Sequence, residues 1–191
     1  IYGLDLGTYE IKVYDKKQDS TWKEKNVIAI VDGKEILAVG DEAYAMFERT
    51  PGNIEVVFPM KEGVISRFTD MQYLLQNLLK KERRFARGSE YLIAVPTDVT
   101  EVEKRAFFDL VVHSTAKAKE VSIVERGVAQ CIGMGVDVRK TKGMLIADFG
   151  AATTELSVVG SGGMVLNKML KIGGMTFDVA VQNMVRRNYD F

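Results

Sequence analysis

The sequence lacks three features that would each point to a different class of protein. It has one cysteine in 191 residues, Cys131, so no disulfide can form within the chain, and a lone thiol fits a reducing, cytoplasmic compartment. Its 26 basic residues balance its 26 acidic residues, which argues against a bulk nucleic-acid binder, so no nucleic-acid partner is expected. No apolar run is long enough to cross a bilayer, and no signal peptide is visible.

What the sequence does contain is the composition of an ordinary globular protein. It is 47% hydrophobic and 27% charged. The chain starts at Ile1 inside an apolar strand pattern and stops at Phe191 without a helix-ending signal. We therefore expect both ends to be boundaries of a piece of a longer protein.

Apolar periodicity near the start of the chain predicts strands and tight turns. Apolar residues alternate over residues 1–16 on both sides of a polar turn, which predicts a hairpin. A second hairpin follows, with Asp32-Gly33 as a type I′ turn. Asp41 is then in position to cap a short helix over residues 42–48.

Helical periodicity dominates the middle of the chain. Leucine and methionine spacing predicts an amphipathic helix over residues 70–83. Thr100 and Glu103 form a capping box that opens a second helix. Strands and helices then alternate to the end, which predicts an α/β fold with a mixed sheet flanked by helices.

One short pattern occurs twice. The run that begins at Ile1, Ile-Tyr-Gly-Leu-Asp-Leu-Gly-Thr, is repeated from Leu145 as Leu-Ile-Ala-Asp-Phe-Gly-Ala-Ala-Thr-Thr. Each copy is a strand that ends in aspartate, then a glycine turn with hydroxyls, then a second strand. Such turns expose backbone N–H groups to an anion, and an aspartate at a strand end can hold the water shell of Mg²⁺. Two such turns would grip one phosphate tail; the simpler interpretation is two ordinary hairpin turns.

With these motifs in place, the chain resembles the MreB family of bacterial actin homologues. This family lies within the actin, heat-shock chaperone and sugar-kinase superfamily, and the resemblance covers nearly the whole chain. The matching segments are Asp5–Thr8, Ala38–Ala43, Arg49–Asn53, Pro59–Ile65, Val95–Thr97 and Val102–Ala106.

The resemblance implies a fold and a division into lobes. The fold would be a ribonuclease-H-like, actin-type ATPase domain. Residues 1–25 and 69–139 would form the core of the first lobe, and residues 26–68 a small inserted subdomain. Residues 140–191 would begin a second, truncated lobe.

The resemblance also implies an activity and partners. Family members close on ATP and Mg²⁺, polymerise with copies of themselves, and lie on the inner face of the cytoplasmic membrane with cell-wall-synthesis or shape machinery. The full-length protein would couple ATP hydrolysis to polymerisation, whereas this piece alone would be inactive. The alternative is a degenerate scaffold or adaptor with weak or no ATPase activity.

Site residues are implied one by one. Asp5 and Asp148 would face Mg²⁺ through water, and Glu125 would orient the attacking water. The phosphate cradle would comprise Gly7, Thr8, Lys12, Gly150, Ala151, Ala152 and Thr153. Membrane contact would come from Arg84, Phe85 and Arg87, although a helix end with basic residues near its dipole is the alternative there.

Six positions depart from the family pattern or have a simpler explanation. Ala151 and Ala152 replace two glycines of the usual Asp-Ile-Gly-Gly-Gly-Thr-Thr-Glu run, so a Cβ would conflict with a phosphate oxygen or a positive φ. After Glu125, Arg-Gly replaces the usual Glu-Pro. Glu125 itself would also fit as a carboxylate at a helix N-terminus, and Lys12 as a solvated strand lysine.

Overall fold

The computed structural model describes residues 1–81 and 88–189. The described chain folds as two compact units. Unit 1 comprises residues 1–95 and 99–124, and unit 2 comprises residues 96–98 together with the chain from residue 125 onward. The chain therefore passes between the units three times.

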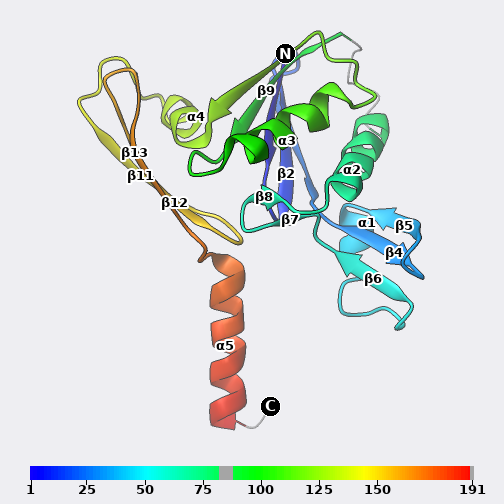
Figure 1. The fold of residues 1–191 in the computed structure, drawn as a ribbon. Coiled ribbons are helices and arrows are strands. Elements are labelled where there is room, and N and C mark those ends of the chain that lie inside the picture. Colours follow the sequence, from blue (N-terminus) through cyan, green and yellow to red (C-terminus); the bar gives the residue numbers. More distant parts are fainter. Residues whose placement is uncertain (82–87, 190–191) are drawn as a thin grey trace. The chain divides into compact units, whose positions relative to one another are not determined.

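Unit 1 is built on a mixed five-stranded sheet (Figure 1). Its order is β10-β9-β1-β2-β3, with β10 at Glu120–Glu125, β9 at Glu90–Val95, β1 at Tyr2–Leu6, β2 at Glu10–Asp15 and β3 at Ser20–Lys25. β1 pairs antiparallel with β2, which confirms the first predicted hairpin, and parallel with β9. Strand β3 is not predicted from the sequence, because its residues, Ser-Thr-Trp-Lys-Glu-Lys, show no apolar alternation.

The helices of unit 1 enclose one large core. Helices α2 (Phe68–Lys81) and α3 (Glu101–Val112) contribute leucines and Phe107 to the same buried cluster as Leu4 and Leu6 of β1. Side chains alternate across a strand, so Asp5 lies on the opposite face of the sheet from this core. Thr100 and Glu103 form the predicted capping box, with both reciprocal bonds present.

A smaller sheet lies within the segment predicted as an insertion. Its order is β5-β4-β6, from β5 (Glu35–Val39), β4 (Ile28–Val31) and β6 (Ile54–Val57). Helix α1 (Asp41–Tyr44) supplies Ala43 to its separate core, and β7 (Met60–Lys61) pairs with β8 (Val64–Ile65). Asp32 and Gly33 have φ of 51° and 66°, as the predicted type I′ turn requires.

The predicted cap of α1 is wrong. Gly40 is the N-cap residue, with φ 66°, and Asp41 is already the first helical residue. The N–H of Asp41 instead donates to Oε1 of Glu24 at 2.6 Å, so a residue of β3 satisfies the helix N-terminus. Local spacing gives no sign of a cap supplied from another strand.

Unit 2 is a three-stranded antiparallel sheet with two helices (Figure 1). Its strands are β11 (Met144–Phe149), β12 (Thr154–Gly160) and β13 (Gly163–Leu170). Helix α4 (Arg126–Gly133) supplies Cys131 to a small core on one face, and α5 (Gly174–Tyr189) has no buried residue. The division predicted between residues 139 and 140 falls inside this unit, because α4 packs with these strands.

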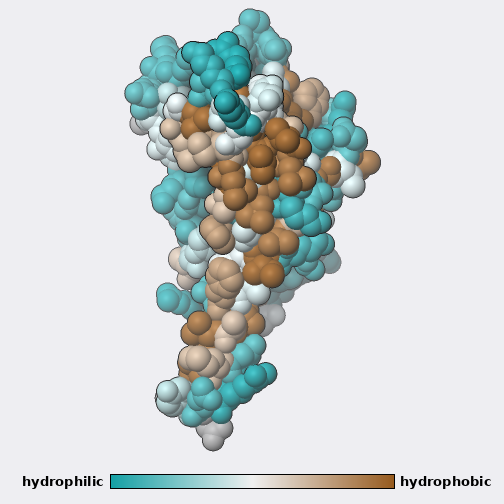
Figure 2. Space-filling view, turned by 90° about the vertical axis from the view of Figure 1, so that its left-hand side faces the viewer, coloured by the Kyte–Doolittle hydropathy of each residue, from teal (hydrophilic) through white to brown (hydrophobic). Residues whose placement is uncertain are grey.

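The other face of this sheet is apolar and open. Leu145, Phe149 and Leu166 are 67%, 71% and 65% exposed, and Phe177 of α5 is 51% exposed. Figure 2 shows apolar side chains gathered in a band that continues down the helix at the bottom of the view. No helix in the two described ranges combines the length and apolar character needed to cross a membrane.

Candidate nucleotide-phosphate site

The turn between β1 and β2 is closed by its first glycine. The N–H of Gly7 donates to the carbonyl of Glu10 at 3.1 Å, and a Cβ at Gly7 would lie 2.7 Å from that same oxygen. Any other residue would force the turn open. Buried Asn26 donates from Nδ2 to the carbonyl of Gly7 at 2.8 Å, which fixes the turn further.

The turn between β11 and β12 has the same construction. The N–H of Gly150 donates to the carbonyl of Thr153 at 2.8 Å, and a Cβ at Gly150 would lie 2.9 Å from this oxygen. The pattern that repeats in the sequence therefore repeats in backbone hydrogen bonding and in the steric need for glycine.

The second turn is also joined to helix α5. Gly174 and Met175 donate their N–H groups to the carbonyls of Gly150 and Ala151, at 3.0 and 2.8 Å. A Cβ at Gly173 would lie 2.6 Å from the Gly150 carbonyl, so this approach also requires glycine. The first N–H groups of α5 therefore donate to carbonyls of the second turn, and these hydrogen bonds hold the turn in place.

The two alanines of the second turn adopt ordinary backbone conformations. Neither Ala151 nor Ala152 has a positive φ. The expected conflict between a Cβ and a left-handed backbone is therefore absent, and this part of the sequence-based concern is wrong. What remains is the space that two methyl groups take up beside the turn.

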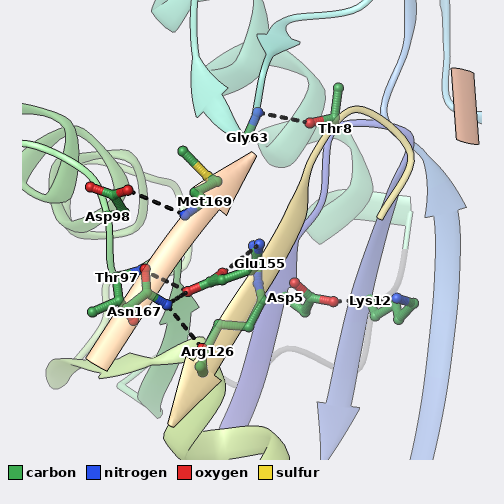
Figure 3. Close-up of polar contacts among 11 residues, drawn as sticks. Asp5, Thr8, Lys12, Gly63, Thr97, Asp98, Arg126, Glu155, Asn167 and Met169 are labelled. Carbon is green, nitrogen blue, oxygen red and sulfur yellow. Dashed lines mark hydrogen bonds and ion pairs between the residues drawn. The ribbon is translucent and has the colours of Figure 1, made fainter. Parts of the chain in front are cut away.

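Asp5 and Lys12 lie directly opposite each other in the β1–β2 ladder. Lys12 Nζ lies 3.3 Å from Asp5 Oδ2, and the two side chains are 51% and 34% exposed (Figure 3). An exposed pair of this kind contributes only about 0–1 kcal/mol to stability. Both groups remain accessible, and the pair places the ammonium of Lys12 beside the carboxylate predicted to face Mg²⁺.

Thr8 accepts a hydrogen bond from a neighbouring hairpin. Its Oγ1 accepts the N–H of Gly63, in the turn between β7 and β8, at 3.2 Å (Figure 3). A hydroxyl that accepts one bond still has one hydrogen to donate. This contact is compatible with the predicted role of Thr8 at a phosphate.

Asp148 has a different cross-strand neighbour from Asp5. Opposite Asp148 in the β11–β12 ladder is Glu155, whose side chain is 3% exposed. Glu155 Oε1 accepts the N–H of Thr97 at 3.1 Å and Nδ2 of Asn167 at 2.7 Å, and Arg126 Nη1 lies 3.9 Å from Oε2 (Figure 3).

Glu155, the buried cross-strand neighbour of Asp148, is not among the residues predicted from the sequence. It stands seven residues after Asp148, as Lys12 stands seven residues after Asp5. This spacing was the available signal, because in a tight hairpin it makes the two residues cross-strand partners.

Glu125 ends β10 and serves as the N-cap residue of α4. Its backbone is extended, with φ −64° and ψ 130°, and its side chain makes no capping hydrogen bond. The carboxylate is therefore not engaged by the N–H groups of the helix. Its position at the N-terminus of α4 is also where the helix dipole favours a carboxylate, so the alternative role at the helix end stays open.

The profile of the MreB/Mbl protein family matches residues 1–191. The chain belongs to the MreB/Mbl family. The cell shape-determining protein MreB of Escherichia coli K12 is 39% identical over 194 residues, which cover 97% of this chain and 55% of that protein. This MreB/Mbl chain thus spans about half the length of that curated relative.

Solved structures confirm the predicted actin-like α/β fold of this MreB/Mbl chain. MreB5 of Spiroplasma citri bound to ADP has a TM-score of 0.90 and 29% identity, over 99% of this chain and 57% of that one. The same protein bound to AMPPNP also gives a TM-score of 0.90. The MamK double helical filament, at 20% identity and a TM-score of 0.79, covers 99% of this chain and 59% of that chain, and supports the fold alone.

The Arg126-Gly127 departure from the MreB pattern has a steric reason. A Cβ at Gly127 would lie 2.7 Å from Cβ of Ser157 on β12 and 2.9 Å from Cε of Met164 on β13. Glycine therefore lets the first turn of α4 approach the sheet closely. A proline ring at this position would require Ser157 to move.

Within residues 1–81 and 88–189, no three histidine, cysteine, aspartate or glutamate side chains gather closely enough to chelate a metal directly. Asp5 and Asp148, the aspartates predicted to face Mg²⁺, are each partly exposed. The predicted membrane residues Arg84, Phe85 and Arg87 lie outside the described residues.

Proposed function

We propose that the full-length protein is an actin-like cytoskeletal protein that binds ATP with Mg²⁺, polymerises into filaments and helps to determine cell shape. The support is family membership, the name of the E. coli relative, and the ADP and AMPPNP bound to the S. citri relative. Self-association is proposed on the same family basis.

The observation that carries nucleotide binding is the repeated hairpin. Both turns pair a glycine N–H with the carbonyl three residues on, at 3.1 and 2.8 Å, and both follow an aspartate by two residues. The remaining N–H groups and the hydroxyls of such turns suit phosphate oxygens. Asp5 and Asp148 would hold the waters of Mg²⁺, which would offset the charge of the phosphate tail.

The proposed reaction is hydrolysis of ATP. Glu125 would orient the attacking water, and Lys12 would bind a phosphate oxygen, so that most of the catalysis is positioning and charge stabilisation. The second candidate is a scaffold with weak or no ATPase activity. The methyl groups of Ala151 and Ala152, which occupy space beside the second turn, favour this candidate.

The test is a titration of the full-length protein with Mg²⁺-ATP, with released phosphate and sedimented polymer measured together. We expect saturable binding, phosphate release that rises with polymer, and loss of turnover in Glu125→Ala with little change in affinity. Polymer without phosphate release would establish the scaffold, and absence of nucleotide binding would overturn the proposal. Residues 1–191 alone are expected to bind ATP weakly, which provides a baseline.

The location is proposed to be cytoplasmic, on the inner face of the membrane, together with shape or cell-wall-synthesis machinery. The support is the sequence around Phe85, an apolar side chain with Arg84 and Arg87 beside it. Anionic headgroups attract each arginine by roughly 1 kcal/mol, so many copies in a filament are needed for firm binding. Polymer of Phe85→Ser should co-sediment with anionic liposomes less than the parent polymer; equal amounts would contradict the proposal.

A further inference from the structure

Glu155 is a buried carboxylate that contacts three separate segments of unit 2. Its side chain is 3% exposed, and its oxygens meet β13 through Asn167, the 96–98 segment through Thr97, and α4 through Arg126. Buried charge is retained at a cost unless its partners are well placed. The network therefore fixes the positions of all three pieces.

Two of these pieces are the places where the chain passes between the units. Residues 96–98 belong to unit 2, while the chain on either side of them belongs to unit 1. Glu125 begins the last passage, and Arg126 follows it directly. Both connections to unit 1 are thus held by one carboxylate.

Further contacts hold each connection in place. The N–H of Met169 on β13 donates to Asp98 Oδ2 at 3.2 Å, so the 96–98 segment is bound at two points (Figure 3). Asn167 Nδ2 also donates to Ser157 Oγ at 2.9 Å, and Ser157 is the residue against which Gly127 packs. The start of α4 is therefore held by both charge and close packing.

Glu155 also adjoins the second hairpin motif. It lies directly opposite Asp148, and two like charges at such positions repel each other. The guanidinium of Arg126 offsets this repulsion, because it lies 3.9 Å from Glu155 Oε2. Arg126 is the first residue of α4, so its distance from Glu155 depends on the position of the helix N-terminus.

We infer that Glu155, through Arg126 and Thr97, is a positioning residue that fixes Glu125 and the 96–98 segment relative to the second phosphate turn. The inference rests on the proposed ATP hydrolysis for its effect on turnover. Its effect on the two chain connections does not depend on that function. Glu155 itself is not assigned contact with nucleotide or water.

The experiment uses the full-length protein and two readouts. Glu155→Gln removes the charge and keeps the shape, Glu155→Ala removes the anchor, and Glu120→Gln is the control, an exposed position on β10, the strand that ends at Glu125. Amide exchange at Thr97 and Asp98, and over residues 125–128, is measured without nucleotide. Turnover and ATP affinity are measured separately, and circular dichroism checks the fold of each variant.

We expect Glu155→Ala to speed exchange in both segments and Glu155→Gln to lower turnover about 10- to 100-fold, as a small misplacement of a catalytic group does. ATP affinity should stay within about threefold in Glu155→Gln, a split that general loss of structure would not give. Arg126→Gln should lower turnover much less in the Glu155→Gln background than it does in the parent protein.

Three results would overturn the inference: parent-like exchange in Glu155→Ala, turnover in Glu155→Gln equal to that in Glu120→Gln, or fully additive effects of the Arg126 and Glu155 changes. If the parent releases no phosphate, the proposed hydrolysis fails, and the exchange result alone supports or overturns the anchor. If Glu155→Ala does not fold, amide exchange over residues 125–128 is measured in Glu155→Gln instead. Faster exchange than in the parent would support the anchor, and parent-like exchange would overturn it.

Discussion

The two Asp-x-Gly hairpins share a backbone and differ in what lies opposite the aspartate. In unit 1, Asp5 is paired with Lys12 on an exposed face. In unit 2, Asp148 is opposite Glu155, which is buried and turned toward Arg126 and Asn167. One turn geometry thus supports two different arrangements of charge, open to a ligand in one unit and tied into the protein in the other.

The supports beneath the two hairpins differ as well. The β1–β2 hairpin rests on a core shared by a five-stranded sheet and two helices, in which Phe107 is fully buried. The β11–β12 hairpin rests on three strands and a small cluster around Cys131, with an open apolar face. Because apolar burial is the main stabilising contribution, unit 1 should resist unfolding more strongly than unit 2 in the chain of residues 1–191.

The largest expected contrast comes from one substitution made once in each unit. Phe107→Ala should lower the free energy of unfolding by about 3–5 kcal/mol, because it leaves a cavity in a closed core. Phe177→Ala, at a half-exposed position of α5, should change it by less than about 0.5 kcal/mol. Urea unfolding of residues 1–191 measures both, and similar losses would remove the contrast between the units.

Repeating Phe177→Ala in the full-length protein sharpens this comparison. If the rest of the chain covers α5, the loss should rise to the range of a buried phenylalanine, about 3–5 kcal/mol. A value that stays below about 0.5 kcal/mol would mean that this face is open in the whole protein too.

Each unit carries a natural reporter of its own unfolding. Trp22 packs against the core of unit 1, and Cys131 is buried in unit 2, where burial raises the pKa of its thiol. At pH 8 the folded thiol should react slowly because little of it is thiolate; unfolding returns the pKa to its ordinary value and speeds the reaction.

We expect thiol reactivity to appear about 1 M earlier in urea than the Trp22 fluorescence change, a gap of about 2 kcal/mol at a typical m-value. Coincident transitions would show that the two units unfold together. Cys131→Ser labelled in parallel controls for reagent binding elsewhere.

Removing either aspartate tests whether the two hairpins serve one ligand. In the full-length protein, Asp5→Ala and Asp148→Ala should each weaken Mg²⁺-ATP binding about tenfold, or about 1.4 kcal/mol. Calorimetry gives both values, and Asp137→Asn, at an exposed loop carboxylate, is the control for charge alone. A loss confined to Asp5→Ala would mean that the second turn does not contact the phosphates.

The smallest effect is expected at the alanines of the second turn. Ala151 and Ala152 lack positive φ, so glycine is not needed there, and each Ala→Gly change should destabilise the chain by about 0.5–1 kcal/mol through backbone entropy. Gly7→Ala in the first turn should cost more, since its Cβ would lie 2.7 Å from a carbonyl oxygen. A marked gain of ATP affinity in Ala151→Gly would instead show that the methyl group obstructs the phosphate.

Local sequence determined the parts of this protein that depend on neighbouring residues. Apolar alternation marks β1 and β2, Asp32-Gly33 marks a type I′ turn, and Thr100 with Glu103 marks a helix start. The repeat of Asp5-x-Gly7 at Asp148 was visible for the same reason. A turn or cap is set by residues within a few positions of each other, so its chemistry can be read along the chain.

Tertiary structure alone decided the features that join distant residues. Glu24 satisfies the N–H of Asp41 across 17 positions, and Glu155 holds Thr97 across 58. In the sequence, Gly127 is only a departure from the proline of the family pattern. In the structure, it allows α4 to approach Ser157 closely. Which side chains meet at such points is settled by how strands and helices pack, because burial, charge pairing and steric room arise from the whole fold rather than from any one segment.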